Sequence, residues 1–204
     1  MTIASKKPPI KLTVGAQYIC FNTMTTDGEW QSGQYASEVT KLPTVVSAEI
    51  SDVADTYDAY ASGAIYDTDT DVIAKQIAVE NIAFSNLLIA QMRGDTIDGG
   101  VIVSGGKRVR PYFAYGLVKL FKDGSKHLCW YPKCKLIEND DTNTTSNESH
   151  TDQNKSVTIK AFTINDNGDT DVSIDTSVTE YADVTEAEFF ATPIETAAEA
   201  KALI

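Results

Sequence analysis

The sequence is poor in the residues and segments that most often carry chemistry or span membranes. It contains three cysteines and two histidines among 204 residues. It has no uninterrupted apolar run of about 18 residues, the length that a membrane-spanning helix needs. Lys6 and Lys7 near the start are not followed by the apolar stretch of a signal peptide. We therefore expect a protein that is neither exported nor inserted into a membrane, with its cysteines reduced.

Positive charge is also scarce, because 17 lysines and arginines face 29 aspartates and glutamates, for a net charge of -12. Affinity for nucleic acid comes largely from basic side chains that displace counterions, so this balance disfavours DNA as a ligand. The basic residues concentrate between 107 and 135, whereas acidic residues dominate the flanks. Repeated copies could therefore meet basic surface to acidic surface. The candidate subunit-contact residues in this segment are Lys107, Arg108, Arg110, Lys133 and Lys135.

The most abundant pattern in the sequence is the alternation of apolar and polar residues. Apolar residues make up 42% of the chain, and most segments alternate with period two and are rich in β-branched and aromatic residues. This pattern predicts a mainly β protein, organised as one domain over 1–204. The predicted strands cover 10–21, 44–51, 71–79, 110–122, 126–137, 156–164 and 170–177.

Two turn sequences stand between predicted strands. The first contains Asp123 and Gly124, and Asp-Gly suits the positive φ values of a tight hairpin turn. The second contains Asn167 and Gly168, which also tolerate left-handed conformations. Each predicts a pair of neighbouring antiparallel strands. The segment 52–71, dense in Asp, Ala and Tyr, fits either an extended hairpin or a mobile arm.

One segment changes period and predicts a helix over 81–93. Its apolar residues recur every three or four positions, as on one face of a helix that packs on the sheet. Asn81 suits the N-cap, Arg93 the last turn and Gly94 the left-handed C-terminal position. The apolar stripe consists of Phe84, Leu87, Leu88 and Met92.

Three further segments have their own character. Residues 1–9 are expected to form an N-terminal arm, and the almost wholly polar stretch 138–154 a solvated loop. A weaker helical pattern runs from 186 to 204 and is interrupted at Thr192-Pro193. We expect residues 185–204 to form a C-terminal extension.

Tests for familiar sites fail. The segment 67–71 opens like a calcium loop, but Val72 and Ala78 stand where glycine and glutamate are required. His127 and its neighbouring cysteines lack a fourth zinc ligand at a sensible spacing. His150 has no plausible nucleophile near it in the sequence. We therefore expect no catalytic residue, no metal site and no cofactor, and we expect that the protein is not an enzyme.

Several motifs then follow one another in a recognisable order. An alternating strand and the short helix lead into Asp-Thr-Ile-Asp-Gly-Gly-Val at 95–101. Arg-Pro-Tyr-Phe-Ala-Tyr-Gly follows at 110–116, and then the Asp-Gly hairpin and an aromatic strand with Trp130 and Tyr131. In order and spacing, the stretch from Val72 to about Ser177 resembles the major tail-tube proteins of siphophages, whose tails are long and non-contractile.

This resemblance implies a fold and a function. The fold would be an antiparallel β-sandwich or partly closed barrel with one packed α-helix, the phage tail-tube fold. The function would be structural, since such subunits form hexameric rings that stack into a hollow tube through which the genome passes. The implied partners are other copies, a tape-measure protein, and tail terminator and distal tail proteins. The implied location is the virion tail, with assembly in the host cytoplasm.

Two other interpretations stay open at this point. The chain could be the tube protein of a contractile tail or secretion apparatus, which shares the fold. It could also be a carbohydrate-binding β-sandwich of the virion, an idea motivated by Trp30, Trp130 and the tyrosines. For a tube, we expect an acidic lumen that lets DNA slide without binding, with the basic stretch between subunits or on the outer wall.

Overall fold

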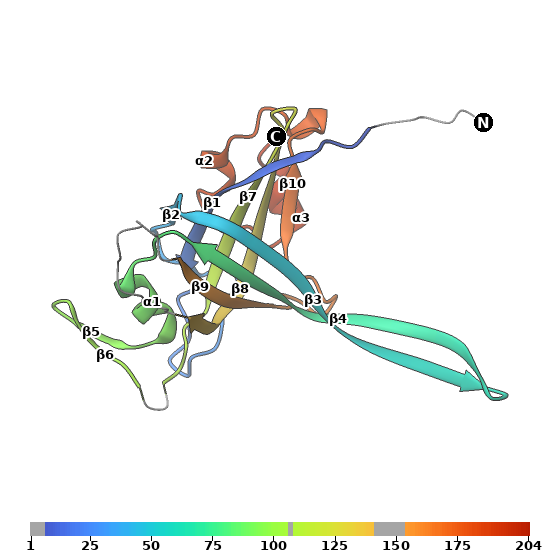
Figure 1. Cartoon of the computed structure of the whole chain (residues 1–204), viewed down its shortest axis with the longest axis horizontal. Helices are drawn as coiled ribbons and strands as arrows, with labels where there is room; N and C mark the ends of the chain where they lie inside the picture. The colour runs from blue at the N-terminus through green and yellow to red at the C-terminus, as the bar shows by residue number, and fades with distance from the viewer. Residues whose placement is uncertain (1–6, 106–107, 141–153) are drawn as a thin grey trace, which may run out of the picture.

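A computed structural model describes residues 7–105, 108–140 and 154–204 of the chain (Figure 1). The described fold is mainly β and antiparallel, as the period-two pattern predicts. The main sheet has the order β2-β1-β7-β8-β9-β4-β3, and β10 also pairs with β8. Its strands are β1 (Lys11–Phe21), β2 (Thr40–Leu42), β3 (Val45–Ala61), β4 (Ala64–Asn81), β7 (Phe113–Phe121), β8 (Lys126–Asp140), β9 (Lys155–Phe162) and β10 (Val172–Asp175).

A second, small sheet pairs β5 (Thr96–Asp98) with β6 (Val101–Val103) and lies beside the helix α1 (Figure 1). Each of the seven predicted strand regions overlaps one strand of the main sheet, but β3 and β4 extend far beyond the predicted 44–51 and 71–79, and β2 was not predicted. Most of the expected N-terminal arm and polar loop, together with Lys107, lies outside the described residues.

The main sheet bends until β1, near one edge, touches β3 at the other. These two strands do not pair, so the described sheet is not a closed barrel. Alternate residues of β7 point to opposite faces and into two separate cores. Phe113, Tyr115 and Leu117 belong to the inner core, whereas Ala114 and Val118 belong to the outer core.

The outer core is covered by the C-terminal segment. Two short helices, α2 (Glu186–Phe189) and α3 (Ala197–Lys201), stand on either side of Thr192-Pro193, where the sequence predicts an interruption. A 3₁₀ turn, η1 (Thr179–Tyr181), precedes them. Phe189 and Phe190 are buried against the sheet. Residues 185–204, the expected C-terminal extension, pack on the sheet, and α2 and α3 lie within the weaker helical pattern of 186–204. The described chain thus has three α-helices where the resemblance implies one packed helix.

The first helix, α1 (Asn86–Arg93), begins five residues later than predicted. Its N-cap is Ser85, whose side chain accepts a hydrogen bond from the Leu88 amide. Asn81 is instead the last residue of β4, and its buried side-chain oxygen accepts from the Gln17 amide at 2.6 Å. Gly94 does take the left-handed conformation expected after the helix, with φ of 73°.

The buried face of α1 differs in part from the predicted apolar stripe. Ile89, Ala90 and Met92 are buried, and Phe84 and Leu88 pack partly against the inner core. Leu87, expected in the same stripe, is 48% exposed. Successive helical residues are about 100° apart, so a face built on Leu88 and Met92 leaves Leu87 outside it.

The two predicted turns behave differently. Gly124, with φ of 87°, and Asp123 connect β7 to β8, which pair antiparallel as expected. Gly168 is also left-handed, with φ of 82°, but β9 and β10 do not pair with each other. Both run antiparallel to β8, and they pair with different parts of it. The turn at Asn167-Gly168 therefore joins two successive partners of one strand, in place of the expected hairpin.

Candidate functional site

The most prominent feature of the surface is a two-stranded ribbon formed by the distal halves of β3 and β4. It comprises residues 54–72 and extends away from the body, and it is called the arm below (Figure 1). At about 3.3 Å per residue the arm is roughly 25 Å long. Tyr57, Tyr60 and Tyr66 on it are 73%, 69% and 82% exposed. Of the two alternatives for 52–71, the structure has the extended hairpin.

Two local features shape the arm. Ser62 and Gly63 both have positive φ, 53° and 81°, as a two-residue hairpin turn requires. At the base, Val53 pairs with Ala74 and Ala54 with Val72, which leaves Ile73 as an extra residue. Such a bulge bends a strand and increases its twist, so it turns the arm out of the sheet.

The arm is strongly acidic on one side. Residues 54–72 contain five aspartates and no lysine or arginine. Asp55 lies directly opposite Asp71, and Tyr57 lies directly opposite Asp69 on the same face. Like charges directly opposite each other on paired strands destabilise a sheet. A two-stranded ribbon on its own is marginally stable in water, so the arm is a weakly supported part of the described fold.

A basic surface lies on the outer face of β8 and β9. Cys134 and Leu136 point into the inner core, so Lys133 and Lys135 point to the opposite face of the sheet. Lys160 of β9 lies directly opposite Lys135. Lys133, Lys135 and Lys160, with the aromatic rings beneath them, are called the lysine face.

Each ammonium of the lysine face lies over an aromatic ring. The distances from ammonium to ring centre are 5.0 Å for Lys133 over Trp30, 3.8 Å for Lys135 over Tyr112 and 5.6 Å for Lys160 over Phe162. The rings of Tyr112 and Phe162 also meet edge to face at 6.3 Å. The lysine face is therefore a continuous surface with ordered cations.

The other basic candidates are placed elsewhere. Arg110 donates to the carbonyls of Leu136 and Ile137. Arg108 donates to the carbonyl of Gly105 at 2.8 Å and to the Thr96 hydroxyl at 2.7 Å, beside the small sheet. The structure thus brings together Lys133 and Lys135 of the five candidates and adds Lys160. Sequence reasoning missed Lys160 because it lies outside the basic segment, although alternation in 156–164 places it opposite the apolar positions.

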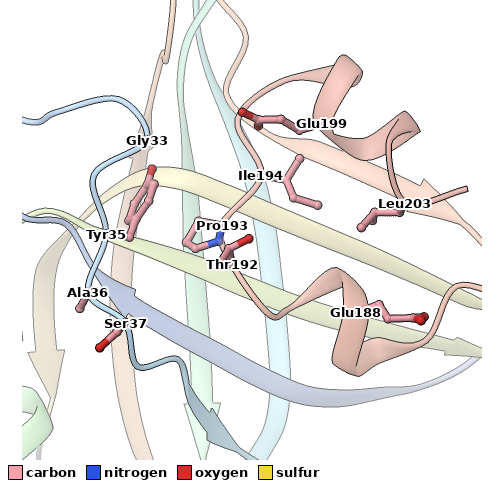
Figure 2. A pocket seen from close by; sticks show the side chains of 10 residues that line it. All are labelled: Gly33, Tyr35, Ala36, Ser37, Glu188, Thr192, Pro193, Ile194, Glu199 and Leu203. Carbon is pink, nitrogen blue, oxygen red and sulfur yellow. The ribbon is translucent and has the colours of Figure 1, made fainter.

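A cavity of about 450 Å³ lies between the loop at 33–37 and the C-terminal helices (Figure 2). Its carboxylates serve the fold. Glu188 accepts hydrogen bonds from Thr185, and Glu199 accepts from the amides of Glu195 and Thr196, so both complete helix caps. The lining is formed by Gly33, Tyr35, Ala36, Ser37, Glu188, Thr192, Pro193, Ile194, Glu199 and Leu203.

Glu195, next to this cavity, is only 8% exposed and joins the C-terminal segment to the N-terminal loop. Its carboxylate accepts from the Gly33 amide at 2.8 Å and the Tyr35 hydroxyl at 2.7 Å, and also from Ser32. Burial and the adjacent carboxylate of Glu195 raise the pKa of Tyr35. This clasp fixes the loop at 32–35 to the C-terminal segment.

The cysteines are poor nucleophiles in this environment. Burial raises the pKa of Cys20 to about 11 and that of Cys129 to about 12, and it raises the pKa of Cys134 as well. All three are therefore neutral thiols near pH 7. Within the described ranges, no three His, Cys, Asp or Glu side chains are grouped so that they could hold a metal ion.

Two further findings bear on the class of protein. No helix in the described part of the chain is long and apolar enough to span a membrane. The sequence matches no protein-family model, and no curated protein is significantly similar to it.

Proposed function

We propose that this chain is a structural subunit that assembles with copies of itself into a tube, the tail tube of a bacteriophage with a long, non-contractile tail. The arm carries the proposal. It is a ribbon of roughly 25 Å that exposes three tyrosines and extends away from the body of its own subunit. Such a surface is typical of an element that is buried when subunits meet.

The shape of the sheet supports the same conclusion. The outer edge of β3 has no partner in the sheet order, and β2 covers only Gln17, Tyr18 and Ile19 of β1. Unpaired strand edges invite pairing with another chain, and a ring of subunits joined edge to edge leaves none exposed. In this proposal the bent sheet with touching edges is a partly closed barrel of the tail-tube type.

The charge fits a conduit for DNA. A net charge of -12 favours a lumen that repels phosphate, so that the genome slides without counterion-release affinity to overcome. The further partners in this proposal are a tape-measure protein and the terminator and distal tail proteins. The site of action is the virion tail, after assembly in the host cytoplasm.

The placement of the two tryptophans argues against the carbohydrate-binding alternative. Trp130 is fully buried and donates its indole N–H to the Phe189 carbonyl at 3.0 Å. Lys133 covers the ring of Trp30. Trp130 therefore offers no face to a sugar, and one face of Trp30 is occupied. The tube of a contractile tail remains the neighbouring possibility, and the presence of a sheath protein in virions would distinguish it.

The test is assembly of the purified protein with and without its arm. Wild-type protein, concentrated and viewed by negative-stain microscopy, should form rings or tubes. A variant in which 54–73 is replaced by Asn-Gly removes the whole arm and joins the paired Val53 and Ala74 through a two-residue turn, so it should stay monomeric with an unchanged melting temperature. Wild-type protein that stays monomeric at every concentration, alone and with a tape-measure protein, would refute the proposal.

A further inference from the structure

We propose that the arm of one subunit docks across the lysine face of a second subunit, so that Asp55 and Asp71 meet Lys135 and Lys160. The inference rests on the proposed function, because it requires copies of the chain to assemble. It adds the identity of the surface that receives the arm.

Each of the two surfaces contains a pair of like charges that repel each other, negative on the arm and positive on the lysine face. On the arm, Asp55 and Asp71 lie directly opposite each other on paired strands. On the body, Lys135 and Lys160 do the same. Like charges in this arrangement destabilise a subunit on its own, and each pair would be neutralised by the other. Both surfaces are thus favourable only when they are brought together.

The charged side chains of both surfaces are held in place before the two subunits meet. The lysines are held over rings of Trp30, Tyr112 and Phe162. Side chains that are already immobilised lose less conformational entropy on binding. The aspartates stand on a hydrogen-bonded ribbon whose register is fixed by the pairing of β3 with β4.

The two surfaces also match in aromatic residues. Tyr57 lies on the same face of the arm as the two aspartates. The edge-to-face rings of Tyr112 and Phe162 lie within the lysine face. A tyrosine added to these rings buries apolar area at the centre of the charge contacts, which is the usual composition of an interface.

The arm does not dock on the lysine face of its own subunit. It points away from the body, and its base is anchored by the ion pair of Lys75 with Asp171 (Figure 1). Because the arm and the lysine face are different surfaces, their contact is head-to-tail. Such a contact propagates from copy to copy until it closes a ring or continues as a helix.

A nucleic acid is the other polyanion that a basic, aromatic surface suggests. Single-stranded nucleic acid binds by stacking bases on open ring faces. Here the ammonium groups cover those faces, and the net charge of -12 opposes phosphate. The acidic arm of a second copy is the better occupant.

The experiment uses charge reversal on each surface of the full chain. The arm variant carries Asp55→Lys and Asp71→Lys, and the face variant carries Lys135→Glu and Lys160→Glu. Each should reduce the yield of rings and tubes at least about tenfold, the effect of losing one well-formed charge contact. The variant with all four changes restores the complementarity and the net charge, so it should recover assembly.

Two measurements separate docking from folding. Glu180→Lys with Asp183→Lys changes the net charge of an exposed segment as the arm variant does, and it should leave assembly intact. All variants should unfold near the wild-type temperature. In mixed ¹⁴N and ¹⁵N wild-type protein, a zero-length carboxyl-amine cross-linker should join the peptide of Asp55 or Asp71 to that of Lys135 or Lys160 between chains.

Several outcomes overturn the inference while the proposed function stands. The first is that both charge-reversed variants assemble as well as the wild-type protein. The second is that the variant with all four changes does not recover assembly. The third is that the cross-links between chains join other residues. Oligonucleotide binding that the face variant loses while it still assembles would assign the lysine face to nucleic acid. Wild-type protein that forms neither rings nor tubes would instead refute the proposed function itself.

Discussion

Substitution of Gly116 by alanine should destabilise the subunit by overpacking its outer core. Gly116 lies in β7 under the ring of Phe190. A Cβ at this position would stand 2.6 Å from Cε1 of Phe190 and 3.0 Å from Cβ of Tyr18. The ring of Phe190 has little room to yield. It stacks on Tyr18 with ring centres 3.9 Å apart, and it meets Trp130 edge to face at 5.1 Å.

The size of the effect follows from this confinement. Overpacking of a well-packed core costs about 1–3 kcal/mol, and a ring held on several sides places Gly116→Ala near the upper end. For a chain of this length, 1 kcal/mol lowers the melting temperature by about 2–4 °C. We therefore expect a free energy of unfolding lower by about 2–3 kcal/mol and a melting temperature lower by about 5–10 °C.

Urea denaturation followed by tryptophan fluorescence measures this loss, because the buried Trp130 contacts Phe190 directly. Phe190→Ala alone should cost about 3–5 kcal/mol, since it empties the same site. In the Phe190→Ala background, Gly116→Ala should cost less than about 0.5 kcal/mol, because its partner is gone. The same cost in both backgrounds would show that the glycine is needed for a reason other than the ring.

Three other expectations concern the helix cap, pH and salt. Gly94→Ala should cost at least about 2 kcal/mol in urea denaturation, because the residue is left-handed and a Cβ would overlap the Val109 carbonyl oxygen. Burial, and then the charge of Lys119, lowers the pKa of His127 below its value in the unfolded chain. Because the unfolded chain takes up the proton first, the contribution of neutral His127 to the stability of the fold is complete above about pH 6.5 and declines as the pH falls through the folded pKa. His127→Gln should flatten that part of the curve of stability against pH. In 1 M salt the Debye length falls to about 3 Å, so tube yield in sedimentation should drop while the subunit itself stays folded.

Alternation was a good guide to the strands because it is a local property. In β9, Val157, Ile159 and Ala161 are buried and alternate with the polar Thr158 and Lys160. The bend at Thr192-Pro193 was equally local, because proline lacks the amide that a continuing helix needs. Neither prediction required knowledge of what the segment touches.

The start of α1 could not be read in the same way. Asn81 and Ser85 are both suitable N-caps. The choice is decided by where β4 ends, and Asn81 is held in β4 by pairing with Val45 and Lys155. Those partners lie 36 and 74 positions away in the sequence. Local propensity at Asn81 predicted a helix start that the pairing of β4 overrides, and Ser85 takes the N-cap position instead.

The lysine face illustrates the same limit for function. Lys135 and Lys160 are 25 residues apart, with the undescribed stretch 141–153 between them, and no local pattern links them. They become a pair only because β8 and β9 align in one register. A shift of one residue would turn Lys160 to the other face of the sheet, and the same is true of Asp71 against Asp55. Charge counts could therefore indicate that basic and acidic surfaces meet, but only the register shows which side chains form each surface. Deletion of the bulged Ile73 tests the direction of the arm separately, because it keeps Asp55 opposite Asp71 but removes the bend that turns the arm out of the sheet. It should abolish docking without removing a single charge.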